Sequence, residues 1–227
     1  MIKRKLLLNE YDTATHFWTL SFCFITKAIQ IQNIVEVAGR YAPLDLSTVL
    51  TDGQPFYGNA TLDAVLETSE GTKSERQNRI DEFVNYIDGH VVKIVHPDHP
   101  GRYMIGRTQV QPQYNDFSHA AVQLSAVCEP WFYNEDETVV TLEATETEQT
   151  AQLINTGRLA VVPAIIVSGD VVISVGASSY GLSTGSYFLP ELQLMPGVGL
   201  DRAGIREISY KGSGSITIKY REAVLAA

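Results

Sequence analysis

Apolar and polar residues alternate with a period of two along most of this chain, which is the pattern of half-buried β-strands. Turn residues separate the alternating segments, as in Pro97–Gly101, Pro196–Gly197 and Gly212–Gly214. Many short strands at this spacing are typical of β-sandwiches and barrels, so we expect a mainly β protein. The predicted strands are residues 28–39, 59–67, 90–96, 102–110, 119–131, 138–145, 159–167, 170–177, 186–195, 205–212 and 215–225.

One segment has a helical period instead. Its apolar residues recur at the i, i+3, i+4, i+7 spacing of one helical face: Ile80, Phe83, Val84 and Ile87. We therefore predict an α-helix at about residues 74–88, with Ser74 and Gln77 forming a capping box and Gly89 in the left-handed position after its end. The apolar stripe needs a sheet to pack against, which predicts an N-terminal β-sandwich with one packed helix.

A change in composition divides the chain near residues 135–139. The part from Thr138 onward contains no Trp, His or Cys and carries eight acidic and six basic residues, whereas the part before it carries 18 and 11. We therefore predict two domains, 1–137 and 138–227, each with its own set of strands, and expect them to fold separately. Most of the acidity belongs to the first domain.

The formal net charge of −9 disfavours tight binding to nucleic acid, because an acidic surface repels phosphate. Membrane-spanning and secretion segments are not expected, since every apolar run is shorter than the roughly 18 residues that a span needs. The two cysteines, Cys23 and Cys128, lie inside apolar strand-like runs and are predicted to be buried free thiols. The sequence thus indicates a soluble protein made in the cytoplasm.

Candidate chemistry is sparse. Between residues 90 and 99, His90 and His96 share a strand face but lie about 20 Å apart, too far to bind one metal, while His96 and His99 flank a proline-bounded turn that favours a solvated hairpin tip over a metal site. Carboxylates on the predicted helix, Asp81, Glu82 and Asp88, alternate with Arg76 and Arg79, as on a solvated helix face with ion pairs. We predict no catalytic activity, no metal and no cofactor.

Carbohydrate binding is the main alternative function, because β-sandwiches often stack sugars on exposed aromatic rings. The predicted second domain has five aromatic residues: Tyr180, Tyr187, Phe188, Tyr210 and Tyr220. Tyr220 continues an alternation with Ile216 and Ile218 that faces the core. With no Trp in this domain, a sugar platform is weakly supported.

Residues 154–170 combine a turn with an apolar run. Asn155 and Gly157 are turn-forming residues, and Pro163 suits an edge strand or a bulge because it lacks an amide donor. We expect this segment to begin the second β-sandwich.

These motifs, taken in order, resemble the distal tail (Dit) family of long-tailed bacteriophages and prophages. The resemblance is carried by residues 35–50 (VEVAGRYAPLDLSTVL), by 79–94 with 96–107, by the CEPWFY segment at 128–133, and by 155–225, where the Asn-x-Gly and Pro163 spacing is similar to the start of that family's second domain. The first 33 residues lie outside it. The resemblance implies a galectin-like C-terminal β-sandwich after the ring-forming first domain.

The function that the resemblance implies is structural. Dit proteins form a hexameric ring between the tail tube and the tip or baseplate hub, with a central channel for DNA during genome ejection. This implies a homo-hexamer, contacts with tail tube and hub proteins, and a location at the distal end of the virion tail, where host attachment takes place. An acidic channel would let DNA slide without adhering.

Residues 40–59 are the candidate site for self-association. This long segment is rich in turn residues yet carries apolar side chains with few polar partners, a composition that usually marks an association surface. The predicted interface residues are Leu44, Leu46, Val49, Leu50 and Phe56.

Overall fold

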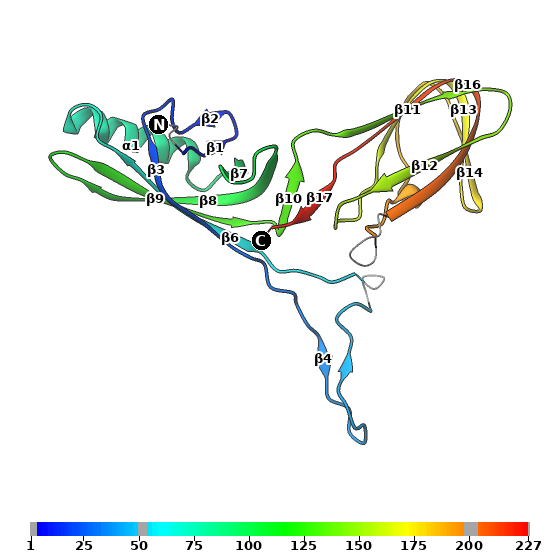
Figure 1. Ribbon diagram of the computed structural model, residues 1–227, viewed down its shortest axis with the longest axis horizontal. Coiled ribbons are helices and arrows are strands. Elements are labelled where there is room, and N and C mark those ends of the chain that lie inside the picture. Colours follow the sequence, from blue (N-terminus) through cyan, green and yellow to red (C-terminus); the bar gives the residue numbers. More distant parts are fainter. Residues whose placement is uncertain (1–3, 50–53, 198–203, 227) are drawn as a thin grey trace. The chain divides into compact units, whose positions relative to one another are not determined.

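The structure is a computed structural model that describes residues 4–49, 54–197 and 204–226. Its contacts divide the chain into two units, Met1–Phe132 with Leu225–Ala227, and Tyr133–Val224. Strands are the main regular structure of both units (Figure 1), which confirms the predicted mainly β class. The predicted boundary at residue 137 lies five residues beyond this division, and separate folding of the two parts stays a prediction.

The first unit is built on a curled sheet with the strand order β2-β1-β7-β8-β9-β6-β3. Strand β10, which pairs with β8, and β17, which pairs with β10, complete its nine strands, and each of the two crosses the division between the units. Neighbouring strands along this order are antiparallel, so short turns are enough to connect β7 to β8 and β8 to β9. The bounds of the strands are β1 (Leu7–Leu8), β2 (Tyr11–Asp12), β3 (Thr19–Thr26), β6 (Ala60–Thr68), β7 (Val91–Val95), β8 (Arg102–Asn115), β9 (Ala120–Cys128), β10 (Trp131–Asn134) and β17 (Ala223–Leu225).

Helix α1 (Lys73–Ile87) occupies the predicted segment, but its cap differs from the prediction. The N-cap is Thr72, whose hydroxyl accepts from the Glu75 amide at 3.3 Å while the Glu75 carboxylate accepts from the Thr72 amide at 2.6 Å. The predicted Ser74 and Gln77 already lie inside the helix. The same spacing occurs at both places, and the charged acceptor makes the stronger cap near the positive end of the helix dipole. Gly89 has a φ of 72°, as predicted.

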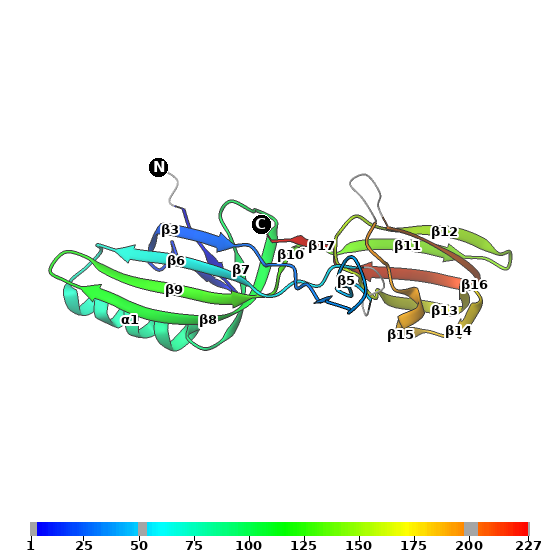
Figure 2. The ribbon, with the colours of Figure 1, turned by 90° about the horizontal axis from the view of Figure 1, so that it is seen from below.

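The apolar stripe of α1 covers one face of the sheet (Figure 2), where Ile80, Phe83 and Ile87 are buried. Arg76 was expected on the solvated flank, and this is wrong: it is 2% exposed. Its guanidinium donates to the carbonyl oxygens of Gly71, Asp116 and Phe117 at 2.5, 3.1 and 3.1 Å. Arg76 therefore ties the start of the helix to the β8–β9 turn, a role that the charge pattern does not reveal.

The second unit is a six-stranded sheet in which two long strands, β13 and β16, pair with each other and each carry two shorter neighbours. The first half of β16 pairs with β12 and its second half with β11. The first half of β13 pairs with β15 and its second half with β14, and β13 and β16 pair with each other. The strands are β11 (Thr138–Ala144), β12 (Gln149–Asn155), β13 (Ala164–Val175), β14 (Ser178–Leu182), β15 (Gly185–Phe188) and β16 (Gly204–Tyr220), with a 3-10 helix η1 (Pro190–Leu192).

Glycines at the middle of β13 and β16 replace the turns that the sequence predicted there. Gly212 and Gly214 both have a φ of 134° and Gly169 one of 106°, and Gly214 lies opposite Gly169 in the ladder. A Cβ on Gly214 would collide with the Ser168 carbonyl oxygen. Both strands continue through this point because glycine permits the bend, so residues 164–175 and 204–220 each form one strand, not two separate strands on either side of the glycines as predicted. Their two halves enclose one shared apolar core.

Asn155 fixes the turn that precedes β13, as its place in the sequence suggested. Its side chain is buried, donates to the carbonyl oxygens of Leu159 and Leu194 at 2.9 and 3.0 Å, and accepts from the Gly157 amide at 2.9 Å. Pro163 is buried immediately before β13 begins, where no ladder hydrogen bond from its nitrogen is needed.

Replacing Asn155 with Asp should destabilise the protein by about 2–4 kcal/mol, because a carboxylate cannot donate to the two carbonyl groups and would be buried without a partner. Urea unfolding with a second-unit probe measures this. Asn85→Asp, an exposed site on α1, is the matched control and should stay within about 0.5 kcal/mol of the wild type. Equal stability of the two variants would contradict the role of Asn155.

Candidate assembly interface

The candidate interface is a long excursion between β3 and β6, residues 29–57, which we call the arm. Its base is closed by hydrogen bonds from the Ile31 amide to the Phe56 carbonyl at 2.8 Å and from the Gly58 amide to the Ile29 carbonyl at 3.0 Å. Its strands β4 (Ile34–Val35) and β5 (Leu44–Asp45) pair with each other in a sheet of their own (Figure 1).

The predicted strand over residues 28–39 is therefore mostly wrong. Only Ile34 and Val35 form a ladder, although apolar and polar residues alternate with a single slip near Asn33 and Ile34. Alternation stabilises a strand when one face packs on a core, and every residue from 31 to 43 is exposed in this chain. The apolar residues of this segment therefore form a surface that the other described residues leave exposed.

Apolar side chains of the arm remain in contact with solvent. Val49 is 63% and Phe56 56% exposed, and Ile29, Ile31 and Tyr41 are also exposed. Of the other predicted interface residues, Leu44 and Leu46 are half-buried, and Leu50 lies outside the described residues. Exposed apolar groups concentrated on one segment mark an association surface.

Local hydrogen bonds shape the arm around β5. The Asn33 amide donates to the Ser47 hydroxyl, and the Ser47 amide donates to an Asp45 carboxylate oxygen, both at 2.8 Å. Hydrogen bonds from the Ser47 side chain and amide lower the pKa of Asp45. The arm thus has a defined turn of its own, and such pre-ordering reduces the entropy that a segment loses when it binds.

A second apolar surface lies on the edge strand β3. Phe22 lies opposite Val65 and Phe24 opposite Asp63. These positions alternate with the buried Leu62, Ala64 and Leu66, so both phenylalanines point to the face away from α1. Both are exposed. The LSFCFI run of the sequence was evident, but only the strand order showed that it forms an edge.

Near the N-terminus, a surface pocket of about 570 Å³ is lined by Glu10, Tyr11, His16, Glu82, Asn85 and Tyr86. The Tyr11 and His16 rings stack at 3.9 Å between centroids, and Tyr86 lies 5.5 Å from Tyr11. Tyr11 lies in β2, His16 in the loop between β2 and β3, and Tyr86 in α1, and no motif in the sequence indicated the pocket.

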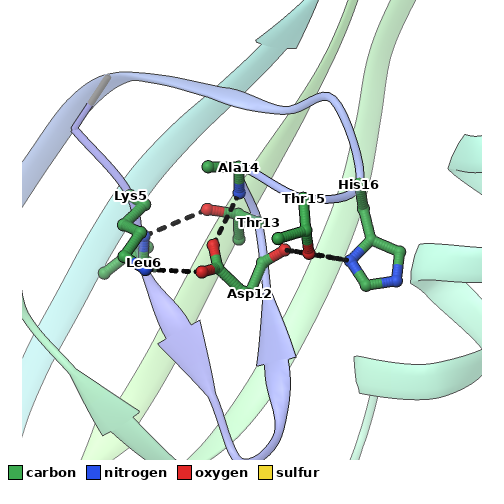
Figure 3. A network of polar contacts seen from close by, with 7 residues as sticks. All are labelled: Lys5, Leu6, Asp12, Thr13, Ala14, Thr15 and His16. Atoms are coloured by element: carbon green, nitrogen blue, oxygen red, sulfur yellow. Dashed lines mark hydrogen bonds and ion pairs between the residues drawn. The ribbon is translucent and has the colours of Figure 1, made fainter. Parts of the chain in front are cut away.

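A polar network holds this loop in place (Figure 3). The Asp12 carboxylate accepts from Lys5 Nζ at 2.5 Å and from the Ala14 amide at 2.9 Å, and His16 Nδ1 lies 2.9 Å from the Asp12 carbonyl oxygen. A carbonyl only accepts, so Nδ1 carries the proton. Burial would raise the pKa of Asp12, but these hydrogen bonds and the Lys5 charge outweigh it and lower the pKa. Asp12 is therefore charged at neutral pH.

The other candidate groups lie as follows. The His96 and His99 rings are 5.5 Å apart, and the described residues contain no group of three or more His, Cys, Asp or Glu side chains arranged to hold a metal.

Both cysteines are free thiols: Cys128 is buried and Cys23 is half-buried. Burial raises the pKa of each thiol to about 12, so both stay protonated. No described helix is long and apolar enough to span a bilayer.

The second-unit tyrosines do not form an open platform. Tyr180 and Tyr187 are half-buried and pack against the core of that unit, and the Tyr187 hydroxyl donates to the Ser183 carbonyl at 2.9 Å. Tyr220 is buried, as predicted, and donates to the Ile154 carbonyl at 2.7 Å. Phe188 is the exposed aromatic residue of this unit.

By its fold, this is a mainly β protein of two antiparallel units, with one helix packed on the sheet of the first unit. No family model matches the chain, and no curated protein matches it significantly in sequence. Among solved structures, it is similar to SPP1 Dit (gp 19.1), described as a paradigm of the hub adsorption apparatus in phages that infect Gram-positive bacteria. The TM-score is 0.61 at 18% identity, over 97% of this chain and 99% of that one.

This likeness covers both units from end to end, so the chain has the fold of a phage distal tail protein. At 18% identity it establishes the fold alone. The resemblance inferred from the sequence is thus confirmed at the level of fold, and the 97% coverage takes in most of the first 33 residues, in which no sequence motif was recognised.

Proposed function

We propose that this chain is a structural protein of a phage tail, a distal tail protein at the tail hub. Six copies would form a ring between the tail tube and the tip or baseplate hub, with a central channel for DNA. The proposal includes assembly in the host cytoplasm and a place at the distal end of the virion tail. Its second unit would be a galectin-like β-sandwich.

The observation that carries this proposal is the arm, whose exposed apolar side chains need a cover that its own chain does not provide. Ring formation supplies such a cover, because a head-to-tail interface that closes on itself gives every copy the same contact. The shared fold with SPP1 Dit, over nearly the whole of both chains, supports a hub role in particular.

The charge of the chain is consistent with a channel that DNA passes through without binding. A net charge of −9 repels phosphate.

Native mass spectrometry of the purified protein tests the ring directly, with six copies as the expected mass. Electron microscopy of virions labelled with an antibody against the second unit should place the label at the end of the tail. A protein that stays monomeric at every concentration, or label on the head, would contradict the proposal.

The alternative function, a carbohydrate-binding accessory module, is tested by replacing Tyr180 and Tyr187 with Ala. Because both side chains pack on the core, we expect some loss of second-unit stability and largely unchanged ring assembly and host adsorption. A glycan array and an adsorption assay provide the measurements. Saturable sugar binding by the wild type that is lost in the double variant would favour the alternative.

A further inference from the structure

The pocket lined by Glu10, Tyr11 and Tyr86 has the chemistry of a site for an organic cation. Aromatic faces attract a cation held over them, and guanidinium groups are the side chains most often found there. Two carboxylates, Glu10 and Glu82, stand at the same pocket, and among the described residues neither forms an ion pair. Both are exposed and free to meet an incoming charge.

The walls of the pocket are set before any ligand arrives. Tyr11 accepts a hydrogen bond from the buried Trp18 indole at 3.2 Å, and its ring contacts Phe83 of α1 at 5.5 Å between centroids. Burial, chiefly, raises the pKa of Tyr11 to about 12. The ring is therefore neutral, and Glu10 and Glu82 supply the negative charge.

The arm offers a matching cation. Arg40 is the only Lys or Arg in residues 29–57 and lies at the tip of the arm, between Gly39 with a φ of 85° and Tyr41. The Arg40 and Tyr41 side chains are exposed, and Tyr41 is uncovered by its own chain. Fully extended, the ten residue steps from Gln30 to Arg40 would span at most about 33 Å, so the arm has the length to reach a neighbouring copy.

From this complementarity we propose that Arg40 at the tip of one arm binds in the pocket formed by Glu10, Tyr11, Glu82 and Tyr86 of a second copy of this chain. The guanidinium pairs with the carboxylates and stacks on a tyrosine ring. This inference rests on the proposed ring and names a contact that closes it. The apolar residues nearer the base of the arm supply most of the contact area, and the Arg40 contact at the tip determines how the two copies are aligned.

A charge-exchange experiment on the full chain tests the pairing. Arg40→Glu and Glu82→Arg are each expected to raise the protein concentration at which assemblies dissociate by at least tenfold, because each places like charges at the contact. The combined variant should recover to within about threefold of the wild type, as in a double-mutant cycle with direct contact. Sedimentation velocity across a dilution series measures dissociation. Asp81→Arg, on the same helix but outside the pocket, is the matched control and should have little effect.

Cross-linking distinguishes a second copy from other occupants. With Arg40→Cys and Tyr86→Cys in one chain, mild oxidation should give covalent multimers that either single variant does not form, since the native thiols stay protonated. Additive effects in the cycle, or no specific multimers, would overturn the pairing. If Arg40→Glu has no effect while removal of the apolar part of the arm yields monomers, this inference fails and the ring stands. A wild type that never self-associates overturns both.

Discussion

Deleting Leu44–Val49 should leave a folded protein that is monomeric at micromolar concentration. The deletion removes β5 and three of the exposed or half-buried apolar side chains of the arm. Each buried Val, Leu or Phe side chain stabilises a contact by about 2 kcal/mol, so losing several weakens association by at least about 100-fold. Because β4 and β5 form a sheet of their own, the nine-stranded sheet should keep its stability. Native mass spectrometry and thermal unfolding provide the two readouts.

Point variants separate the apolar surface from the fold of the arm. Val49→Asp and Phe56→Asp keep the chain length and should each weaken association by at least tenfold. Phe117→Asp is the matched control, since Phe117 is 98% exposed in the β8–β9 turn and outside the arm. Hexamers that persist in the deletion variant, or equal effects of all three point variants, would show that the arm is not the interface.

Replacing Gly214 with Ala should destabilise the second unit by about 3 kcal/mol or more. A Cβ at this position would collide with the Ser168 carbonyl group and lie 3.0 Å from the Gly169 Cα, and the φ of 134° is unfavourable for alanine. For a unit of about 90 residues, this loss lowers the melting temperature by about 12 °C or more. Differential scanning calorimetry measures it.

The matched control is Gly181→Ala in β14, where an added Cβ meets no atom within 4 Å. That variant should melt within a few degrees of the wild type. The same scan tests whether the units fold separately, because an independent second unit loses its own transition while the first keeps its melting temperature. A single transition that shifts as a whole would show that the two fold together. Equal melting of both glycine variants would contradict the role of the bend.

Local patterns were enough to predict much of the first unit. The period of Ile80, Phe83 and Ile87 located α1, because a stripe at helical spacing has one stable solution against a sheet. Strand-like runs of apolar residues bounded by polar and turn-forming ones located β6, β7 and β9. The candidate interface was also visible in the sequence, since apolar residues among turn-forming ones are unfavourable unless a partner covers them.

Where the sequence prediction failed, two or more local solutions had similar free energies. Thr72 with Glu75 and Ser74 with Gln77 both fit a capping box, and the backbone selected the first. From the sequence alone, Arg76 is predicted to be a solvated charge. In the fold, the β8–β9 turn places carbonyl groups within hydrogen-bonding distance of its guanidinium.

The sequence by itself determined the class of the fold, the helix, most strand positions and an uncovered apolar segment, because each depends on neighbours within a few residues. The tertiary structure decided that Gly212 and Gly214 bend a strand instead of ending it, that residues 29–39 belong to the arm instead of a sheet strand, and that Glu82 meets Tyr11 at a pocket. The physical reason is that these features depend on partners distant in the chain. Glycine permits a turn and a bend equally, and only the paired strand selects between them.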